Sequence, residues 1–394
     1  MTSAVCPACS QPSVHSFGRI PEVPVHSCRL MRDRNEARTF QRGTIDLALC
    51  PSCGFIFNTC FDASLLQYNA HYEETQAFSP RFRAFARDLA TTWVDRYGLR
   101  GKTVLEIGCG KGEFLEYLVD AGISQGTGID PGTHPERTSA THAGRISRII
   151  DTFDDRYGRI TADAVVCRHT LEHIAPVREF LLTLRQSLPA DSNIPILFEL
   201  PDFERVLHEE AFWDVYYEHC SYFTRTSLQR LFSACGFDVL DITHAYQDQY
   251  LLLEARPRLT HCASSPPSAN VDIDEMAALA DAYQAGVQHR VQRWTTRLQR
   301  MQAQKQKVVL WGAGSKAVAF LHAVGNAHTA VAAAVDINPY KHSKYLPGTG
   351  HPVLAPDELA TLHPSLIIAM NDVYLGEIAE HLARLDLSCP LESL

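Results

Sequence analysis

The stretch from Lys102 to Gly122, KTVLEIGCGKGEFLEYLVDAG, decides the fold of the central part of the chain. Its apolar run over residues 103–107 predicts a buried strand. Glycines with G-x-G-x-G spacing follow and permit a tight turn and close approach of the backbone to a ligand: Gly108, Gly110 and Gly112. A helix is expected from about Glu113, so the stretch predicts the strand, glycine turn and helix that open a nucleotide-binding α/β domain.

An acidic residue stands at the end of the next predicted strand. Asp130 lies in GTGIDPG, about twenty residues after the glycine turn. A carboxylate there can bind both hydroxyls of an adenosine ribose, which NAD and S-adenosylmethionine (SAM) both carry. NAD would place its pyrophosphate on a turn with G-x-G-x-x-G spacing, and the carboxylate of Glu106 would repel that group. SAM instead carries a positive ammonium on its methionine part, so the pattern favours SAM.

The E-x-G-x-G-x-G pattern with its distal aspartate resembles motifs I and II of class I SAM-dependent methyltransferases. Residues 162–174, ADAVVCRHTLEHI, and residues 195–202, PILFELPD, resemble later strands of that fold. The alternative is an unspecialised α/β domain with a glycine turn. The resemblance implies that SAM is bound by residues of these motifs: Glu106, Gly108, Gly110, Gly112, Asp130 and His169. His173 is expected only to satisfy nearby backbone groups.

Two Cys-x-x-Cys knuckles lie near the N-terminus. Cys6 and Cys9 form the first, and Cys50 and Cys53 form the second. Two such pairs can complete a tetrahedral Cys₄ shell around Zn²⁺, and a closed shell of this kind is structural. Two unrelated cysteine pairs or a redox Cys-x-x-Cys motif are the alternatives.

The length and composition indicate a globular protein of several domains. The chain has 394 residues, a net charge of −9 and 45% hydrophobic residues. The negative charge argues against a nucleic-acid or membrane-surface partner. The sequence has no apolar run long enough for a bilayer span and no signal-peptide pattern, so we expect a cytoplasmic protein.

Changes of pattern divide the chain into four segments of an α/β protein. We expect a zinc-binding domain over residues 1–68, a methyltransferase domain over 69–255, a linker and long helix over 256–306, and a Rossmann-like domain over 307–394. The apolar spacing places the long helix at about residues 274–306.

The last segment opens with a second glycine turn, in VVLWGAGSKA at residues 308–317. Gly312 and Gly314, with Asp336 further on, match a dinucleotide fingerprint and permit an NAD site. Lys316 and Lys341 equally suit the diphosphate of a nucleotide sugar.

The order of these parts, together with YYEHCSYF at residues 216–223 and KYLPGTG at residues 344–350, resembles the sugar C-methyltransferase family. The resemblance implies methyl transfer to a carbon of a nucleoside-diphosphate-linked keto-deoxysugar, after deprotonation next to the ketone. It implies a catalytic group in which His219 is the base: His219, Tyr216, Tyr72 and Glu218. Glu218 is expected to orient His219 or to bind a sugar hydroxyl. The substrate would be bound by residues that include the second glycine turn: Tyr222, Gly312, Gly314, Lys316 and Lys341.

The chain departs from the family pattern at several positions. Tyr217 replaces a histidine, Gly350 stands where a histidine is common, and Met370 replaces a tryptophan. O- or N-methylation of a related sugar or metabolite, and an inactive zinc-ribbon binding protein, therefore stay open as alternatives. A small-molecule substrate and a monomer or homodimer are expected.

Overall fold

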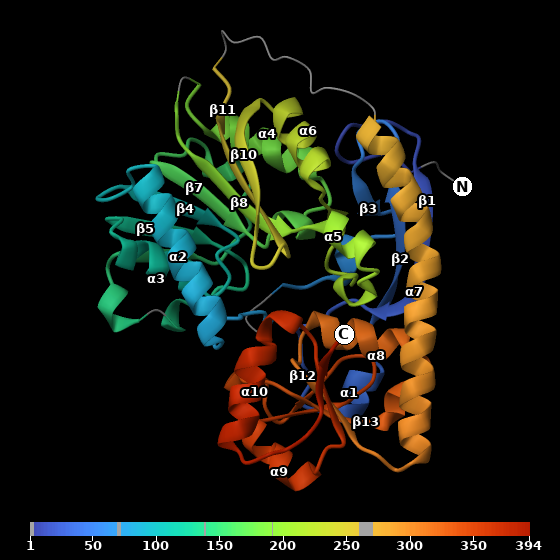
Figure 1. Ribbon diagram of the computed structural model, residues 1–394. Coiled ribbons are helices and arrows are strands. Elements are labelled where there is room, and N and C mark those ends of the chain that lie inside the picture. Colours follow the sequence, from blue (N-terminus) through green and yellow to red (C-terminus); the bar gives the residue numbers. More distant parts are fainter. Residues whose placement is uncertain (1–3, 69–71, 138, 191, 260–270) are drawn as a thin grey trace.

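Three β-sheets organise the chain in the computed structural model, which describes residues 4–68, 72–137, 139–190, 192–259 and 271–394. The central sheet has seven strands, the N-terminal sheet four and the C-terminal sheet six. Figure 1 shows the N-terminal sheet beside the central sheet and the C-terminal sheet below both. The mixed α/β class predicted from the sequence is confirmed. Among the described residues, no helix combines the length and apolarity that a membrane crossing requires.

The N-terminal sheet takes its last strand from the middle of the chain. Its order is β1 (His15–Pro24), β2 (Arg42–Leu49), β3 (Ile56–Asn58) and β9 (Ser221–Tyr222), with antiparallel pairing throughout. The short helix α1 (Arg34–Arg38) connects β1 and β2. Because β9 lies within YYEHCSYF, this sheet fixes the position of that stretch.

The central sheet contains the first glycine turn. Its strand order is β10 (Phe237–Ala245), β11 (Tyr250–Pro257), β8 (Ile196–Pro201), β7 (Ala164–Arg168), β4 (Thr103–Ile107), β5 (Gln125–Ile129) and β6 (Ile146–Ile149). The strands β8, β7, β4, β5 and β6 are parallel. The strand β5 lies on one side of β4, and β7, later in the chain, lies on the other. The strand order therefore reverses at β4, and ligands of such sheets bind at the carboxyl ends of the strands where this reversal occurs.

Helices accompany the central sheet. They are α2 (Pro80–Arg96), α3 (Glu113–Ala121), α4 (Val177–Ser187), α5 (Phe203–His208) and α6 (Arg225–Ala234). The helix α2 begins with Ser79 as its N-cap, whose hydroxyl accepts a hydrogen bond from the Phe82 amide. The segment before α2 is thereby held at the edge of the site described below.

A long helix leads to the third sheet. The structure has α7 at Val271–Ala303, close to the predicted range, and Figure 1 shows it running past both the N-terminal and the C-terminal sheets. The third sheet has the order β14 (Lys344–Tyr345), β15 (Pro352–Leu354), β13 (Val331–Val335), β12 (Val308–Trp311), β16 (Leu366–Ala369) and β17 (Leu391–Ser393). Its helices are α8 (Ser315–Ala323), α9 (Leu359–Leu362) and α10 (Leu375–Arg384). The strand β12 lies between β13 and β16, so its glycine turn also stands where the strand order reverses.

Candidate active site

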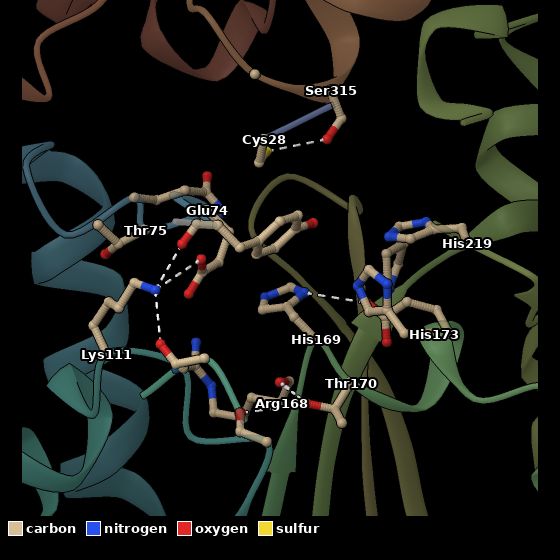
Figure 2. Close-up of a pocket in the computed structure, with 18 of the residues that line it drawn as sticks. Cys28, Glu74, Thr75, Lys111, Arg168, His169, Thr170, His173, His219 and Ser315 are labelled. Carbon is tan, nitrogen blue, oxygen red and sulfur yellow. Dashed lines mark hydrogen bonds and ion pairs between the residues drawn. The ribbon is translucent and has the colours of Figure 1, made fainter. Parts of the chain in front are cut away.

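A cavity of about 790 Å³ lies where the three parts of the chain meet. Its walls come from the turns after β4, β5 and β7, from residues 72–79, from the stretch around β9, and from the turn after β12. Figure 2 shows Lys111 and Glu74 on one side of this pocket, His173 and His219 on the other, and Cys28 and Ser315 at the end next to the C-terminal sheet. Both glycine turns therefore face one space.

The first glycine turn requires glycine for steric reasons. Gly108 has a φ of 71°, and a Cβ atom there would lie 1.9 Å from Thr170 Oγ1. The turn also receives Asp130, whose Oδ2 accepts a hydrogen bond from Gly110 N at 3.0 Å and whose Oδ1 accepts from Gly132 N at 2.6 Å. Each carboxylate oxygen has a second lone pair, so Asp130 can still accept from two ribose hydroxyls.

Glu106 places an unpaired carboxyl group at the cavity. Its side chain is 2% exposed, and Oε2 has no hydrogen-bond partner among the described residues. Burial raises the pKa of Glu106 to about 8. A cationic group of a ligand in the cavity, such as the ammonium of SAM, would supply the partner that the folded chain does not.

His169 lines the cavity and belongs to an ionic network that extends behind it. Its Nε2 lies 3.0 Å from Glu199 Oε1, and Arg168 also binds Glu199. Burial by itself lowers the pKa of His169, but the neighbouring Glu199 carboxylate raises it to about 9. His169 therefore presents a cationic ring to the cavity, in a left-handed backbone conformation with a φ of 47°.

His219 lies at the opposite wall among aromatic rings. Its ring centroid is 4.2 Å from that of Tyr216 and 4.8 Å from that of His173. Burial lowers the pKa of His219 well below its usual value, with a smaller effect from the neighbouring histidines. The ring is therefore neutral near pH 7, and its nitrogens have no hydrogen-bond partner within the described part of the chain. Such a ring can accept a proton from a bound molecule.

Glu218 points away from the cavity, contrary to the role expected for it beside His219. Its Oε1 accepts from Ser27 N at 2.6 Å, and both oxygens accept from the Ser27 hydroxyl at 2.9 Å. The side chain is fully buried and does not line the cavity. Its hydrogen bonds join the stretch before β9 to Ser27, which lies between β1 and β2.

Tyr217 also faces away from the cavity. Its hydroxyl accepts a hydrogen bond from Asp62 N at 2.9 Å, and a Cβ at Gly43 would lie 2.4 Å from its ring. Tyr217 therefore forms no part of the cavity wall.

Lys111 links the segment carrying Tyr72 to the first glycine turn. Its ammonium donates to Tyr72 O at 2.6 Å and to Gly132 O at 3.0 Å, and lies 3.5 Å from Glu74 Oε2. The Lys111 side chain is buried, and both Lys111 and Tyr72 line the cavity. Sequence reasoning missed this lysine, although its place inside the G-x-G-x-G turn was a usable signal.

The C-terminal wall contains the predicted diphosphate residues. Gly312, Gly314, Lys316 and Lys341 all line the cavity. The Lys316 ammonium lies 2.8 Å from Asp214 Oδ1, and that of Lys341 lies 3.1 Å from Asp336 Oδ2. Both lysines are thus held by aspartates, and Asp336 also accepts from Ala313 N at 2.8 Å.

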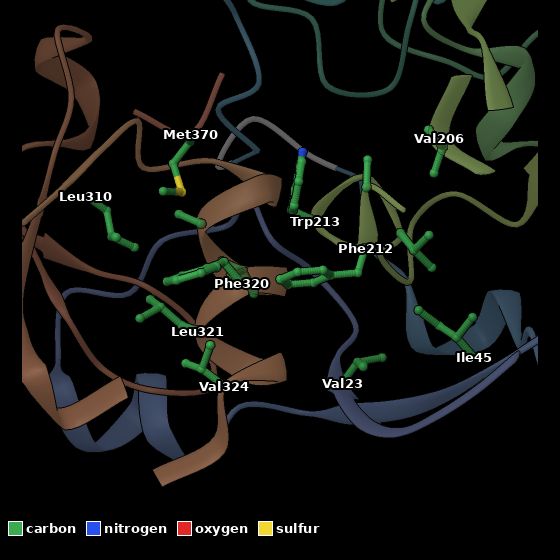
Figure 3. Packing of buried hydrophobic residues seen from close by; sticks show 14 of the residues in the cluster. Val23, Ile45, Val206, Phe212, Trp213, Leu310, Phe320, Leu321, Val324 and Met370 are labelled. Atoms are coloured by element: carbon green, nitrogen blue, oxygen red, sulfur yellow. The ribbon is translucent and has the colours of Figure 1, made fainter. Parts of the chain in front are cut away.

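A shared hydrophobic core holds the C-terminal wall in place. Figure 3 shows Phe320 and Leu321 of α8 packed toward Phe212 and Trp213 of the central part. The rings of Phe212 and Phe320 are stacked with centroids 6.3 Å apart. Val23 and Ile45 of the N-terminal sheet belong to the same cluster. One core therefore sets the mutual position of all three parts.

The four cysteines of the two knuckles come together outside the cavity. Cys6 Sγ lies 3.7 Å from Cys53 Sγ, and Cys9 Sγ lies 3.6 Å from Cys50 Sγ. Four sulfurs bound tetrahedrally at about 2.3 Å from Zn²⁺ lie about 3.8 Å apart, so this arrangement fits the ion.

The structure brings most of the predicted site residues together around the cavity. Those that line it are Tyr72, Glu106, Gly108, Gly110, Asp130, His169, Tyr216, His219, Tyr222, Gly312, Gly314, Lys316 and Lys341. Gly112 lies behind the wall as the N-cap of α3, and Glu218 lies in the interface described above. Residues that sequence reasoning did not single out also line the cavity, including Cys28, Glu172 and Ser315.

Comparisons with known proteins identify two domains in the chain. Residues 80–242 match the family model described as a methyltransferase domain, and residues 267–386 match that of the C-methyltransferase C-terminal domain. The chain is 26% identical over 383 residues to the C-methyltransferase NovU of Streptomyces niveus, covering 93% of this chain and 89% of that protein.

Two further matches cover a smaller share of the chain. The ubiquinone biosynthesis O-methyltransferase of Pseudomonas paraeruginosa is 37% identical over 98 residues, which cover 22% of this chain and 40% of that protein. A structure of the Burkholderia thailandensis 1,6-didemethyltoxoflavin-N1-methyltransferase with bound S-adenosylhomocysteine has 18% identity and a TM-score of 0.36, and covers 44% of this chain and 78% of that one. The two domain matches and the similarity to a C-methyltransferase over most of the chain show a SAM-dependent methyltransferase with a C-methyltransferase C-terminal domain.

Proposed function

We propose that the chain methylates a carbon atom of a nucleoside-diphosphate-linked keto-deoxysugar, with His219 as the base. The observation that carries the proposal is the cavity itself, which joins the turn beside Glu106 and Asp130 to the neutral ring of His219 and to the second glycine turn. The similarity to C-methyltransferase NovU supports transfer to carbon.

The residues of the first glycine turn would hold SAM. Asp130 would accept from the ribose hydroxyls, and the unpaired carboxyl of Glu106 would pair with the methionine ammonium. The bound cofactor supplies an electrophilic methyl group, which a carbon nucleophile can take up.

The opposite wall would generate that nucleophile. A carbon next to a ketone loses a proton as an enolate forms, with the electrons of the C–H bond moving toward the carbonyl oxygen. The His219 ring would take the proton, because it is neutral and its nitrogens are free of partners within the described residues. Burial raises the pKa of Tyr216 and of Tyr72, so both phenols stay protonated and can donate to the enolate oxygen.

The second glycine turn would hold the diphosphate. The helix α8 begins directly after Gly314, and a helix N-terminus favours an anion. Lys316 is the more accessible cation at this wall, with 21% of its side chain exposed. A diphosphate would compete with Asp214 for this ammonium.

The four cysteines would hold a structural Zn²⁺. Their sulfurs lie within 4.8 Å of one another, a closed set that fits tetrahedral coordination. The ion would join the loop before β1 to the loop between β2 and β3 and take no part in the chemistry.

Proton removal can be measured apart from methyl transfer when S-adenosylhomocysteine, which has no methyl group to donate, replaces SAM. Candidate keto sugars are incubated with the protein and S-adenosylhomocysteine in D₂O, and exchange of the acidic C–H is followed by NMR. We expect His219→Asn to slow both the exchange and the methylation by about 10²–10⁴-fold. SAM binding, measured by calorimetry, should stay within about twofold of the wild type.

The matched control is His328→Asn, which removes a histidine that does not line the cavity. It should leave exchange and turnover near wild type. Unchanged exchange in the His219 variant would contradict the assignment of the base. The carbon chemical shift of the new methyl group distinguishes C-methylation from O- or N-methylation.

A further inference from the structure

The cavity wall contains a cluster of side chains that could bind a metal ion, a role that the proposed reaction does not require. Glu172, His173 and His219 each offer a ligand atom, and these atoms all lie within 4.8 Å of one another. We propose that this cluster binds a divalent transition-metal ion, of the kind typified by Zn²⁺.

Glu172 supplies the clearest sign of a missing partner. Its side chain is 2% exposed, and its Oε2 has no hydrogen-bond partner among the described residues. The other oxygen lies 3.7 Å from His169 Nδ1, a long contact, because His169 binds Glu199 more closely through Nε2. A buried carboxylate oxygen without a partner, on the wall of a cavity, calls for a cation or a donor from outside the chain.

His173 is oriented as metal-binding histidines are. Its Nδ1 lies 3.0 Å from the backbone oxygen of Glu218 and 2.9 Å from the Tyr68 hydroxyl. An N–H donated from Nδ1 to that carbonyl leaves the lone pair on Nε2. Ligating histidines commonly use their second nitrogen in this way, which fixes both the tautomer and the ring orientation.

The backbone holds the three residues at this spacing. Cys220 N donates to Glu172 O at 2.9 Å, so the turn after β7 is joined to the stretch before β9. Figure 2 shows the rings of His173 and His219 beside each other at one side of the pocket. Ligand atoms bound tetrahedrally at about 2.1 Å from one ion lie about 3.4 Å apart, so the side chains of the cluster would rotate inward to close around an ion.

The composition of the cluster selects the class of ion. Two imidazoles and one carboxylate suit Zn²⁺, Co²⁺ or Ni²⁺ better than Mg²⁺ or Ca²⁺, which prefer oxygen ligands. Three protein ligands leave coordination positions open toward the cavity. This consequence rests on the proposed function: an ion bound here would occupy the lone pair of His219 and so prevent that ring from removing a proton from the substrate.

Co²⁺ is a suitable probe of the Glu172, His173 and His219 cluster, because bound Co²⁺ absorbs visible light. The full chain with its cysteine cluster saturated with Zn²⁺ is titrated with Co²⁺, and visible absorption and calorimetry are recorded. We expect one additional Co²⁺ per chain, with ligand-field bands but no thiolate charge-transfer band. Glu172→Gln and His173→Asn should each weaken this binding by about 10–100-fold.

The matched control is Glu179→Gln, which changes a carboxylate that also lines the cavity but lies outside the cluster. It should bind Co²⁺ as the wild type does. Absence of the additional Co²⁺, or equal affinity in the Glu172 variant, would overturn the proposal.

Activity distinguishes the metal site from the role of His219. Zn²⁺ added to the wild type should inhibit methyl transfer, and Glu172→Gln should raise the inhibitory concentration about tenfold or more. Binding of Co²⁺ without inhibition by either ion would support the metal site and contradict His219 as the base.

Discussion

Glu106 shows how one buried group can connect ligand binding with stability. Burial raises its pKa to about 8, because the cavity wall offers its carboxylate no partner among the described residues. In the protein without SAM the group holds a proton near pH 7. An ammonium ion beside it would favour the charged form, so SAM binding is expected to release a proton.

The pH dependence of folding tests this account of Glu106. Because the folded state holds the proton up to about pH 8 and the unfolded state loses it near pH 4.5, the stability that Glu106 contributes is complete below about pH 4.5. It is lost as the pH rises toward 8. Glutamine resembles the protonated form of Glu106 and does not titrate. The free energy of unfolding of the wild type therefore falls relative to that of Glu106→Gln as the pH rises from 5 to 8.

Urea denaturation at several pH values measures this difference. The matched control is Glu380→Gln, which changes an exposed carboxyl on α10 and should run parallel to the wild type. A constant difference between Glu106→Gln and the wild type across this range would contradict the raised pKa.

At the scale of elements, the two residues of β9 join the stretch that contains His219 to the N-terminal sheet. Ile56 pairs with Tyr222, and Phe57 pairs with Ser221. The second cysteine knuckle directly precedes β3, and Cys50 N donates to Phe55 O at 2.8 Å. The cysteine cluster therefore supports the strand against which the His219 stretch is placed.

Loss of the proposed zinc should therefore reduce turnover without abolishing SAM binding. Cys53→Ser is expected to lower kcat about tenfold or more, because β3 no longer holds β9 firmly. Methyl transfer and calorimetry with S-adenosylhomocysteine measure the two effects. Cys60→Ser, which changes a cysteine outside the cluster, is the control and should behave as wild type. If Cys53→Ser lost SAM affinity as strongly as turnover, the argument that the cysteine cluster supports only the His219 stretch would be contradicted.

At the scale of the whole molecule, the shared core decides where the C-terminal wall stands. Phe320 is fully buried and contacts Phe212 and Trp294 with ring centroids 6.3 and 5.5 Å apart. It belongs to α8, which begins at the second glycine turn. Packing far from the chemistry therefore sets one side of the cavity.

Phe320→Ala should separate this effect from general destabilisation. Removal of a buried phenylalanine side chain costs about 3–5 kcal/mol of unfolding free energy. We also expect KM for the substrate to rise while KM for SAM stays near wild type, because only the C-terminal wall moves. Phe232→Ala, in the separate core of the central sheet, should cost similar stability without this change in KM. Equal effects on both KM values in both variants would contradict the argument.

Local patterns in the sequence predicted those strands, turns and helices that are set by residues close together in the chain. The apolar run before Gly108 and the one before Gly312 each predicted a strand, a turn and a helix, and the structure has them. The contacts of Glu218 with Ser27 and of Lys111 with Tyr72 could not be predicted, because each joins residues far apart in the chain. Tyr217 shows the same limit, since its direction depends on packing against the N-terminal sheet.

The sequence alone determined the class of fold and its cofactor, because a glycine turn after a buried strand and a distal aspartate form a chemical pattern within one short unit. Only the tertiary structure decided which side chains share the cavity. Glu172 and His173 meet His219 because β9 joins the N-terminal sheet and Cys220 N bonds to Glu172 O. The physical reason is that strand and helix periodicity act over a few residues, whereas the site is set by a core common to all three parts.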